Sequence, residues 1–283
     1  MVCTQFTETD MSTPAHPLQR DLERIEREAW ADLAAAAPPP LAQGIGLQTA
    51  PVGGAFQFMA SRIPQFQFNW LSGAGLNGDD GRSITAAVKR FRDAGQHKFF
   101  IQVPPGGRTS ECEALASAAG LQPHPLAWAK FYRSTAGVEP VTTALTVREV
   151  GSHERDLFST TAIAGFGMAR PMAAWLSQLV GRPRWHTYVT FSDGQPAGAA
   201  AMYVHGEFAW FGIGSSKPEM RRLGSQRALL ARRLKDAATL GAKHATTETG
   251  VPQEAQPAPS YSNILAAGFT VAYVRPNWAE AQS

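Results

Sequence analysis

The stretch SSKPEMRRLGSQRALLARRL, residues 215–234, contains residue types that can hold an anion. Six residues stand where an apolar strand gives way to a helix: Arg221, Arg222, Leu223, Gly224, Ser225 and Gln226. A helix start offers backbone N–H groups without partners, and a glycine before it lets the backbone close around phosphate oxygens. The pattern therefore predicts a phosphate-binding loop. A loop that binds nothing is the alternative.

The elements around this loop follow from periodicity and turn residues. We expect a strand at 144–150, a helical region at 171–181, and three antiparallel strands joined by the turns SDGQP and HGE. A helix at 226–241, a strand at 242–249, a shorter helix that ends at Gly268 and a last strand at 271–275 follow.

The first half repeats part of this order. A helix at 83–95 precedes a strand-like run at 97–103, a shorter helix that ends at Gly120, and a strand at 127–133. Four elements in the same order at similar spacing predict two related units. We divide the chain into an amino-terminal helix (17–37) with a proline-rich linker in 1–50, a first unit at 51–140 with strands at 55–61 and 65–71, and a second unit at 141–283.

Composition excludes several classes of protein. The chain has 283 residues, 44% of them hydrophobic and 17% charged, so it can bury two cores and contains little that favours disorder. Its formal net charge is only +3, with a pI near 9.0 and no basic aromatic patch, so we expect no nucleic-acid partner. Cys3 and Cys112 are the only cysteines, and no secretory signal or membrane-length apolar run occurs, which favours the cytoplasm and no membrane partner.

Two further patterns are weighed and set aside. The seven histidines are scattered without ligand spacing, so we expect no metal site. Residues 73–78 read G-x-G-x-x-G, but NGDDGRS separates these glycines from the next helix, which favours a glycine turn over a dinucleotide-binding loop.

The surroundings of Gly224 resemble the GNAT (GCN5-related N-acetyltransferase) superfamily. That family's pyrophosphate loop reads Arg or Gln, two residues, Gly, one residue, Gly or Ala, and begins three residues after the proline of a Pro-Glu pair. Pro218-Glu219, Arg221 and Gly224 match, and the order of elements from 144 to the last strand matches too. Gln226 departs from the final Gly or Ala, which puts close packing at that point in doubt. The implied fold is a tandem GNAT-like α/β protein with a largely antiparallel, helix-flanked sheet.

The resemblance implies acetyl-CoA as co-substrate and direct acetyl transfer to a primary amine. The residues that it assigns to CoA are Gly214, Ser215, Ser216, Arg221, Arg222, Leu223, Gly224, Ser225, Gln226 and Asn263. Basic residues on the following helix are expected to be mostly a solvated face, with one or two near the 3′-phosphate: Arg227, Arg232, Arg233 and Lys235. The first unit has no such loop before its helix at Ser83, so we predict that it is degenerate and shapes the acceptor site or packs as a partner domain.

The chemical groups are less clear from the residues. The family often donates a proton to the thiolate from a tyrosine at a position that is Ile264 here. Tyr261, on the same helical face, is the substitute, and a tyrosine that only caps the helix is the alternative. Glu248 can accept the amine proton directly or through water, and an exposed strand-end glutamate is its alternative.

The sequence therefore predicts an N-acetyltransferase, with a non-catalytic acyl-CoA-binding or sensing module as the rival and a nucleic-acid-binding protein last. The amine acceptor, the length of the acyl group and the oligomeric state, a homodimer included, stay open.

Overall fold

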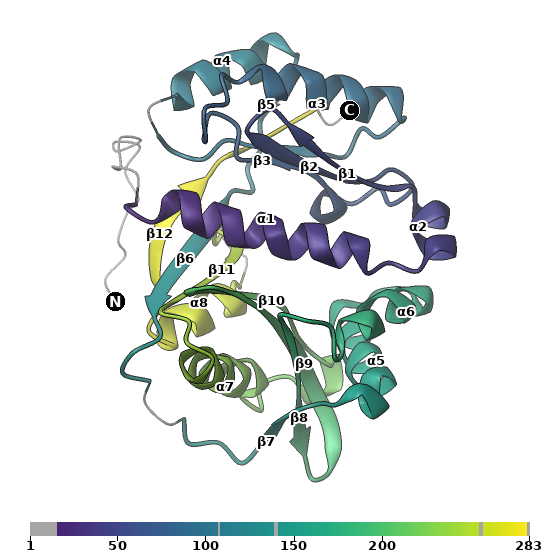
Figure 1. Cartoon of the computed structure of the whole chain (residues 1–283), viewed down its shortest axis with the longest axis vertical. Helices are drawn as coiled ribbons and strands as arrows, with labels where there is room; N and C mark the ends of the chain where they lie inside the picture. Colours follow the sequence, from purple (N-terminus) through teal and green to yellow (C-terminus); the bar gives the residue numbers. More distant parts are fainter. Residues whose placement is uncertain (1–15, 107, 139–140, 255–256, 282–283) are drawn as a thin grey trace.

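The computed structural model describes residues 16–106, 108–138, 141–254 and 257–281. Two mixed sheets are stacked along the long axis of the molecule, with helix α1 (Gln19–Ala35) between them (Figure 1). One face of α1 carries buried apolar side chains, Leu22, Ile25 and Leu33, which join a core with residues of both sheets. This amphipathic helix is therefore shared by the two halves of the fold.

The first sheet has six strands in the order β1-β2-β3-β4-β13-β5. Its amino-terminal elements are α2 (Pro39–Ile45), β1 (Leu47–Val52), β2 (Ala55–Ala60), β3 (Asn69–Ser72), α3 (Arg82–Asp93), β4 (Phe100–Gln102), α4 (Thr109–Ala118) and β5 (Gln122–Pro123). Helices α3 and α4 bury Ile84, Phe91 and Cys112 against one face of the sheet, and α1 covers the other.

The second sheet has seven strands in the order β12-β6-β11-β10-β9-β8-β7. The elements after β5 are β6 (Trp128–Ser134), β7 (Thr146–Glu149), α5 (Arg155–Phe166), α6 (Ala173–Leu176), β8 (Trp185–Ser192), β9 (Gln195–His205), β10 (Phe208–Ser216), α7 (Ser225–Thr239), β11 (His244–Gly250), α8 (Pro259–Ala266), β12 (Thr270–Arg275) and β13 (Asn277–Ala279). Helices α7 and α8 pack on one face, and α1, α5 and α6 pack on the other.

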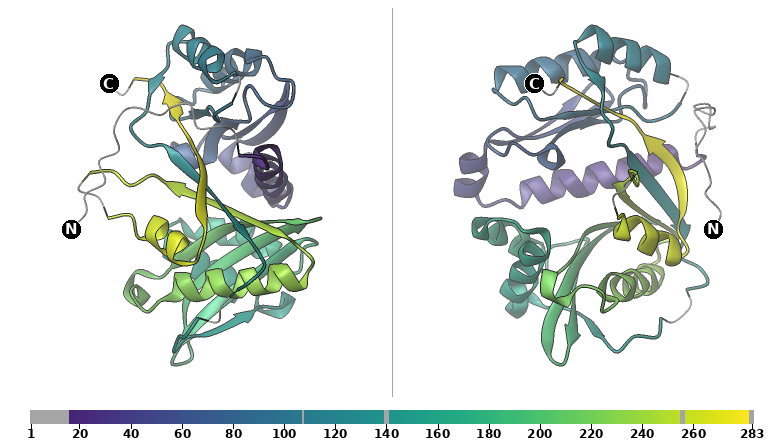
Figure 2. Two further views of the ribbon diagram at one scale, coloured as in Figure 1. Left: turned by 90° about the vertical axis from the view of Figure 1, so that its left-hand side faces the viewer. Right: turned by 180° about the vertical axis from the view of Figure 1, so that it is seen from behind.

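The two sheets exchange strands. Strand β6 leaves the first half of the chain and lies between β11 and β12, antiparallel to both. Strand β13 follows β12 but lies between β4 and β5 of the first sheet. Figure 2 shows β6 and β12 running side by side from one half of the molecule to the other. Each half therefore needs a segment of the other to complete its sheet.

The expected fold class, a mixed α/β protein with largely antiparallel, helix-flanked sheets, is confirmed. Two local expectations are wrong, and one helix was missed. The run 65–71 is a short 3-10 helix followed by β3, whereas the helical region expected at 171–181 is present as the turn α6 between two 3-10 turns. Helix α5 was not expected, and the prolines after α1 start α2 instead of a linker, because proline is well accepted in the first helical turn.

No helix in the described part of the chain has both the length and the apolar character needed to cross a bilayer. Cys112 is buried in the first unit and forms no disulfide, and Cys3 lies outside the described residues.

Candidate functional site

Helix α7 begins with a glycine in the left-handed region. Gly224 has φ +86°, and the space around it is open, because a Cβ built there would meet no atom within 4 Å. Ser225 is buried, and its hydroxyl lies 2.7 Å from the Thr190 hydroxyl, so its side chain anchors the helix to the sheet. Arg221, Arg222 and Leu223 are exposed in the loop before it.

Most backbone donors of this loop have no hydrogen-bond acceptor in the described ranges. The Arg221 N–H donates to the Pro218 carbonyl, and the next occupied amide belongs to Ala228, which donates to Gly224 at 3.0 Å. The N–H groups of residues 222–227 meet no acceptor among the described residues. Free amides at the positive end of a helix of this length favour an anionic ligand.

Strands β10 and β11 separate just behind this helix. They pair in parallel only from Phe208 to Trp210, and β11 then follows β6 while β10 follows β9. A bulge between Gly212 and Ser215, with Ile213 at φ +51°, bends β10 away. Gly214, Ser215 and Ser216 form the diverging end of β10 and leave its edge facing the gap.

A cavity of about 700 Å³ passes through this divergence. Its lining includes Gly214 and Gln226 near the loop, Arg233 and Ile264 on the α7 and α8 face, and Glu248 with residues of α1 on the opposite side. Gln226 of the predicted anion loop and the predicted base Glu248 therefore line the same cavity.

Glu248 belongs to a buried ionic cluster. Its carboxylate accepts hydrogen bonds from Lys130 Nζ at 3.0 Å and from Trp210 Nε1 at 3.0 and 3.1 Å. Lys130, which is fully buried on β6, also pairs with Glu26 of α1. Arg275 of β12 donates to Glu26 at 2.8 Å and to Glu23 at 3.2 Å. The cluster joins the exchanged strands to the shared helix.

The two carboxylates beside Lys130 have opposite pKa shifts. Burial and the negative charge of Glu26 raise the pKa of Glu248, against the pull of Lys130 and Arg275. Burial also opposes the charge of Glu26, but Arg275 and Lys130 outweigh it and lower its pKa to about 2. Burial disfavours the charge of Lys130 too, yet the attraction of Glu248 and Glu26 raises its pKa. Glu248 is therefore the carboxylate of the pair that takes a proton more readily. Its side chain is 12% exposed, so the alternative of an exposed strand-end glutamate is wrong.

Arg233 is the residue that the sequence placed wrongly. It is 2% exposed instead of solvated, and it donates to the carbonyls of Gly212 and Ala201 at 3.2 and 3.0 Å. No carboxylate pairs with it in the described part of the chain, and burial lowers its pKa to about 9. Its Nη2 has no hydrogen-bond partner among the described residues and lies 3.7 Å from where a Cβ on Gly214 would be. The spacing with Leu229 and Ala237, one turn on either side, is the signal that could have predicted burial.

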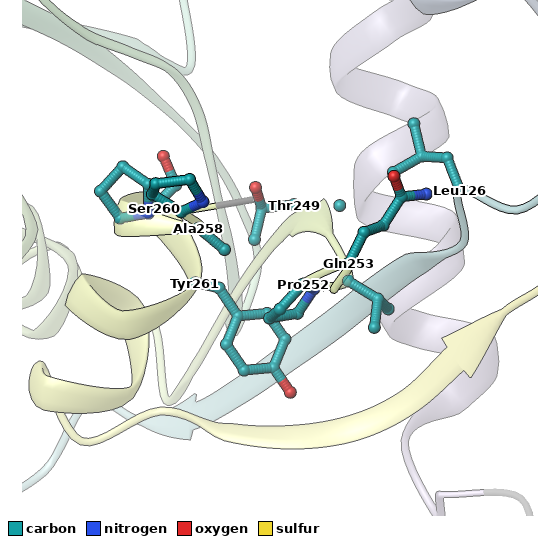
Figure 3. A pocket seen from close by; sticks show the side chains of 11 residues that line it. Leu126, Thr249, Pro252, Gln253, Ala258, Ser260 and Tyr261 are labelled. Carbon is teal, nitrogen blue, oxygen red and sulfur yellow. The ribbon is translucent and has the colours of Figure 1, made fainter. Parts of the chain in front are cut away.

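Tyr261 lies away from Glu248. It lines a smaller hollow of about 240 Å³ over the end of β11, and its ring packs edge-on against Phe131 at 5.0 Å. Figure 3 shows the Tyr261 hydroxyl pointing away from Thr249 and Ser260, the two residues that line both hollows. Tyr261 makes no capping hydrogen bond for α8 either. Asn263, two residues on, donates to the Gln226 side chain at 2.8 Å and ties α8 to the start of α7.

No group of three or more histidine, cysteine or acidic side chains suited to a metal ion occurs in the ranges described. The cavity walls that sequence reasoning missed are Trp30 of α1, Trp70 of β3, and Trp210 of β10. Their convergence depends on the packing of three elements that are far apart in sequence.

Comparison with known proteins agrees with this geometry. No protein-family model matches the sequence, and the search of curated proteins gave no match. Solved structures do match. A GCN5-related N-acetyltransferase from Kribbella flavida is 13% identical, with a TM-score of 0.57 over 89% of this chain and 96% of that one. A tandem GNAT protein from the clavulanic acid biosynthesis pathway is 17% identical, with a TM-score of 0.54 over 95% and 98%. The chain has the fold of the GNAT acetyltransferases, and its structural neighbours include a tandem GNAT protein.

Proposed function

We propose that this protein is an acyl-CoA-dependent N-acyltransferase that transfers an acetyl group directly to a primary amine. One observation carries the proposal: a single cavity reaches from Gln226, which lies at the start of α7 among the open amides, to the buried carboxylate of Glu248. An enzyme of this class needs an anion site for the CoA phosphates and a base near the thioester. The GNAT fold of the chain agrees with the same activity.

The loop and the end of β10 supply the CoA site in this proposal. The amides of residues 222–227 receive the pyrophosphate, and Gly224 keeps the approach free of a side chain. Leu223 contributes only its backbone, and Arg221 adds a charge at the rim. Gly214, Ser215 and Ser216 offer the diverging edge of β10 to the pantetheine arm. Asn263 holds Gln226 in place beside them.

Glu248 accepts the proton of the bound ammonium. The neutral amine then forms the new C–N bond at the thioester carbonyl, the C–S bond breaks, and the second proton goes to solvent or to the departing thiolate. Arg233 takes the place of the tyrosine that the GNAT pattern would put at position 264, since its free Nη2 lies beside Gly214 on the cavity lining. Its charge stabilises the thiolate electrostatically. Tyr261 serves this role less well, because its hydroxyl points away from the shared wall of the two hollows.

A non-catalytic acyl-CoA-binding module is the second candidate. It is favoured by Ile264 at the usual tyrosine position and by the absence of Tyr261 from the lining of the large cavity. Release of free thiol from acetyl-CoA, measured with a broad panel of amines, distinguishes the two functions. Tight CoA binding without turnover on any amine would contradict the transferase and support the binding module.

A further inference from the structure

The walls of the large cavity differ in polarity from one of its ends. The walls are predominantly apolar and aromatic, with a few polar residues such as Gln65, Gln67 and Gln102, and they come from both halves of the chain. Six of the aromatic residues are Trp30, Phe66, Phe68, Trp70, Trp175 and Trp210. Trp30 is central, since its ring lies 5.5 Å from that of Trp70 and 6.1 Å from that of Trp210. A volume of about 700 Å³ suits a small organic molecule with a ring or another bulky apolar group.

The polar end of the cavity is the ionic cluster. Among the residues that the structure describes, three carboxylates meet there, Glu23, Glu26 and Glu248, with two cations, Lys130 and Arg275. Arg233, the other charged residue on the lining, contacts backbone carbonyls and none of these carboxylates. The ionised cluster is therefore one positive charge short. Glu26, Glu248 and Arg275 line the cavity, and Glu248 is the most exposed of the three.

Trp210 connects the two regions. Its indole N–H donates to the Glu248 carboxylate, while its ring belongs to the aromatic wall beside Trp30. An ammonium group at Glu248 would supply the missing charge. The rest of the molecule would then lie against rings that offer few hydrogen-bonding groups.

We infer that the acceptor is a primary amine on an aromatic or similarly bulky apolar body, bound with its nitrogen at Glu248 and its body against Trp30 and Trp210. This inference rests on the acyl transfer proposed above. Polyamines, amino sugars and aminoglycosides would leave buried polar groups unpaired against these walls. A bulky acyl chain would fill the space between the walls but would not neutralise the excess negative charge of the cluster.

The first test compares amines at fixed acetyl-CoA by thiol release. We expect kcat/KM for 2-phenylethylamine to exceed the values for spermidine and glucosamine at least tenfold. Equal or higher values for spermidine or glucosamine would overturn the inference and leave the proposed transfer intact. A gain with phenylacetyl-CoA over acetyl-CoA that depends on Trp30 would assign the walls to the acyl group instead, which also overturns it.

The second test measures binding without any acyl-CoA, so it does not depend on turnover. Calorimetry on the full chain should show 2-phenylethylamine binding at least tenfold more tightly than its neutral isostere 2-phenylethanol. Glu248→Gln should remove that preference, because it removes the excess negative charge. Binding with this pattern but no turnover would refute the transferase and keep the cavity specificity. Equal affinity of the wild-type chain for both compounds would overturn the inference.

Two variants test the walls. Trp30→Ala should raise KM for 2-phenylethylamine at least tenfold with CoA affinity unchanged, and Trp278→Ala, a half-buried tryptophan outside the lining, is its matched control. Ala169→Trp fills the cavity from an exposed position and should raise the same KM even if Trp30→Ala folds poorly. An unchanged KM in Ala169→Trp, or in a folded Trp30→Ala, would overturn the assignment of the walls.

Discussion

The starts of helices α3 and α7 occupy matching positions in the two halves and differ in what meets their amides. Both begin after a left-handed glycine, Gly81 at φ +85° and Gly224 at φ +86°. At α3 the chain supplies its own anion: the Asp79 carboxylate accepts from the Gly75 and Gly81 amides at 2.8 and 3.1 Å and from the Ser83 hydroxyl at 2.8 Å. At α7 no described carboxylate approaches, and the amides stay open.

The difference shows how one backbone arrangement serves two purposes. A helix start with free amides is stabilised by any anion, whether a side chain or a ligand. In the first half the internal carboxylate closes the glycine-rich loop and makes it structural. In the second half the open amides leave a place for a phosphate, and this supports our proposal that only the second unit binds CoA.

Filling the open site should have the largest effect. Gly224→Glu places a side chain and a like charge at the phosphate position, and we expect CoA binding to fall below detection in calorimetric titration. Gly241→Glu is the control for the strain of a side chain at positive φ. Gly241 has φ +87° and open space around it at the other end of α7, so this variant should bind CoA normally. Normal CoA binding by folded Gly224→Glu would mean that this loop binds no phosphate.

Removing the base should affect chemistry without affecting the loop. Glu248→Gln is expected to lower kcat by about 10²- to 10⁴-fold, the usual contribution of a general base, while the Kd for CoA stays unchanged. A parallel loss of CoA affinity would show that Glu248 acts on binding and not on proton transfer.

The pH profile tests the same residue. Burial and the charge of Glu26 raise the pKa of Glu248, so its basic form is lost as the pH falls through a value above the ordinary carboxyl range. We therefore expect log kcat/KM to decline with unit slope on the acid side from that raised value. Glu248→Gln should remove this limb. A limb that persists in the variant would assign it to another group.

Removing the internal carboxylate at the start of α3 tests the comparison in the first half of the chain. Asp79→Asn removes the carboxylate that holds three donors, and we expect the free energy of unfolding to fall by about 1–3 kcal/mol. Denaturant unfolding measures the loss, and calorimetry should still give one CoA per chain. Unchanged stability would show that the internal anion does not close the loop.

The rim of the open site should matter least. Arg221→Ala removes one exposed charge and leaves every amide in place, so the cost to CoA binding is about 1 kcal/mol, the typical net contribution of one hydrogen bond. That corresponds to a Kd raised by roughly fivefold. Arg227→Ala, at the exposed side of the same helix start, gives a comparison within the loop region. A loss of CoA affinity as large as that of Gly224→Glu would show that side chains, and not backbone amides, contribute most of the binding.

The sequence by itself determined the local features of this protein. The strand-loop-helix unit at 208–239, its glycine before α7 and the alternating strands around it follow from turn residues and periodicity, because these depend on neighbours within a few positions. The set-aside G-x-G-x-x-G at 73–78 stays consistent with a structural turn for the same reason. The burial of Arg233 could also have been predicted from its spacing with the buried residues of α7, but its charge led us to expect a solvated side chain.

Only the tertiary structure decided which distant segments meet. Nothing in residues 128–134 shows that this strand lies between β11 and β12, since strand pairing depends on partners far along the chain. That exchange brings Lys130 to Glu248, and the shared helix α1 brings Glu26 and Trp30 to the same cavity. The raised pKa of Glu248 and the charge deficit beside it arise from burial among these groups, and burial is a property of the packed chain and not of any one segment.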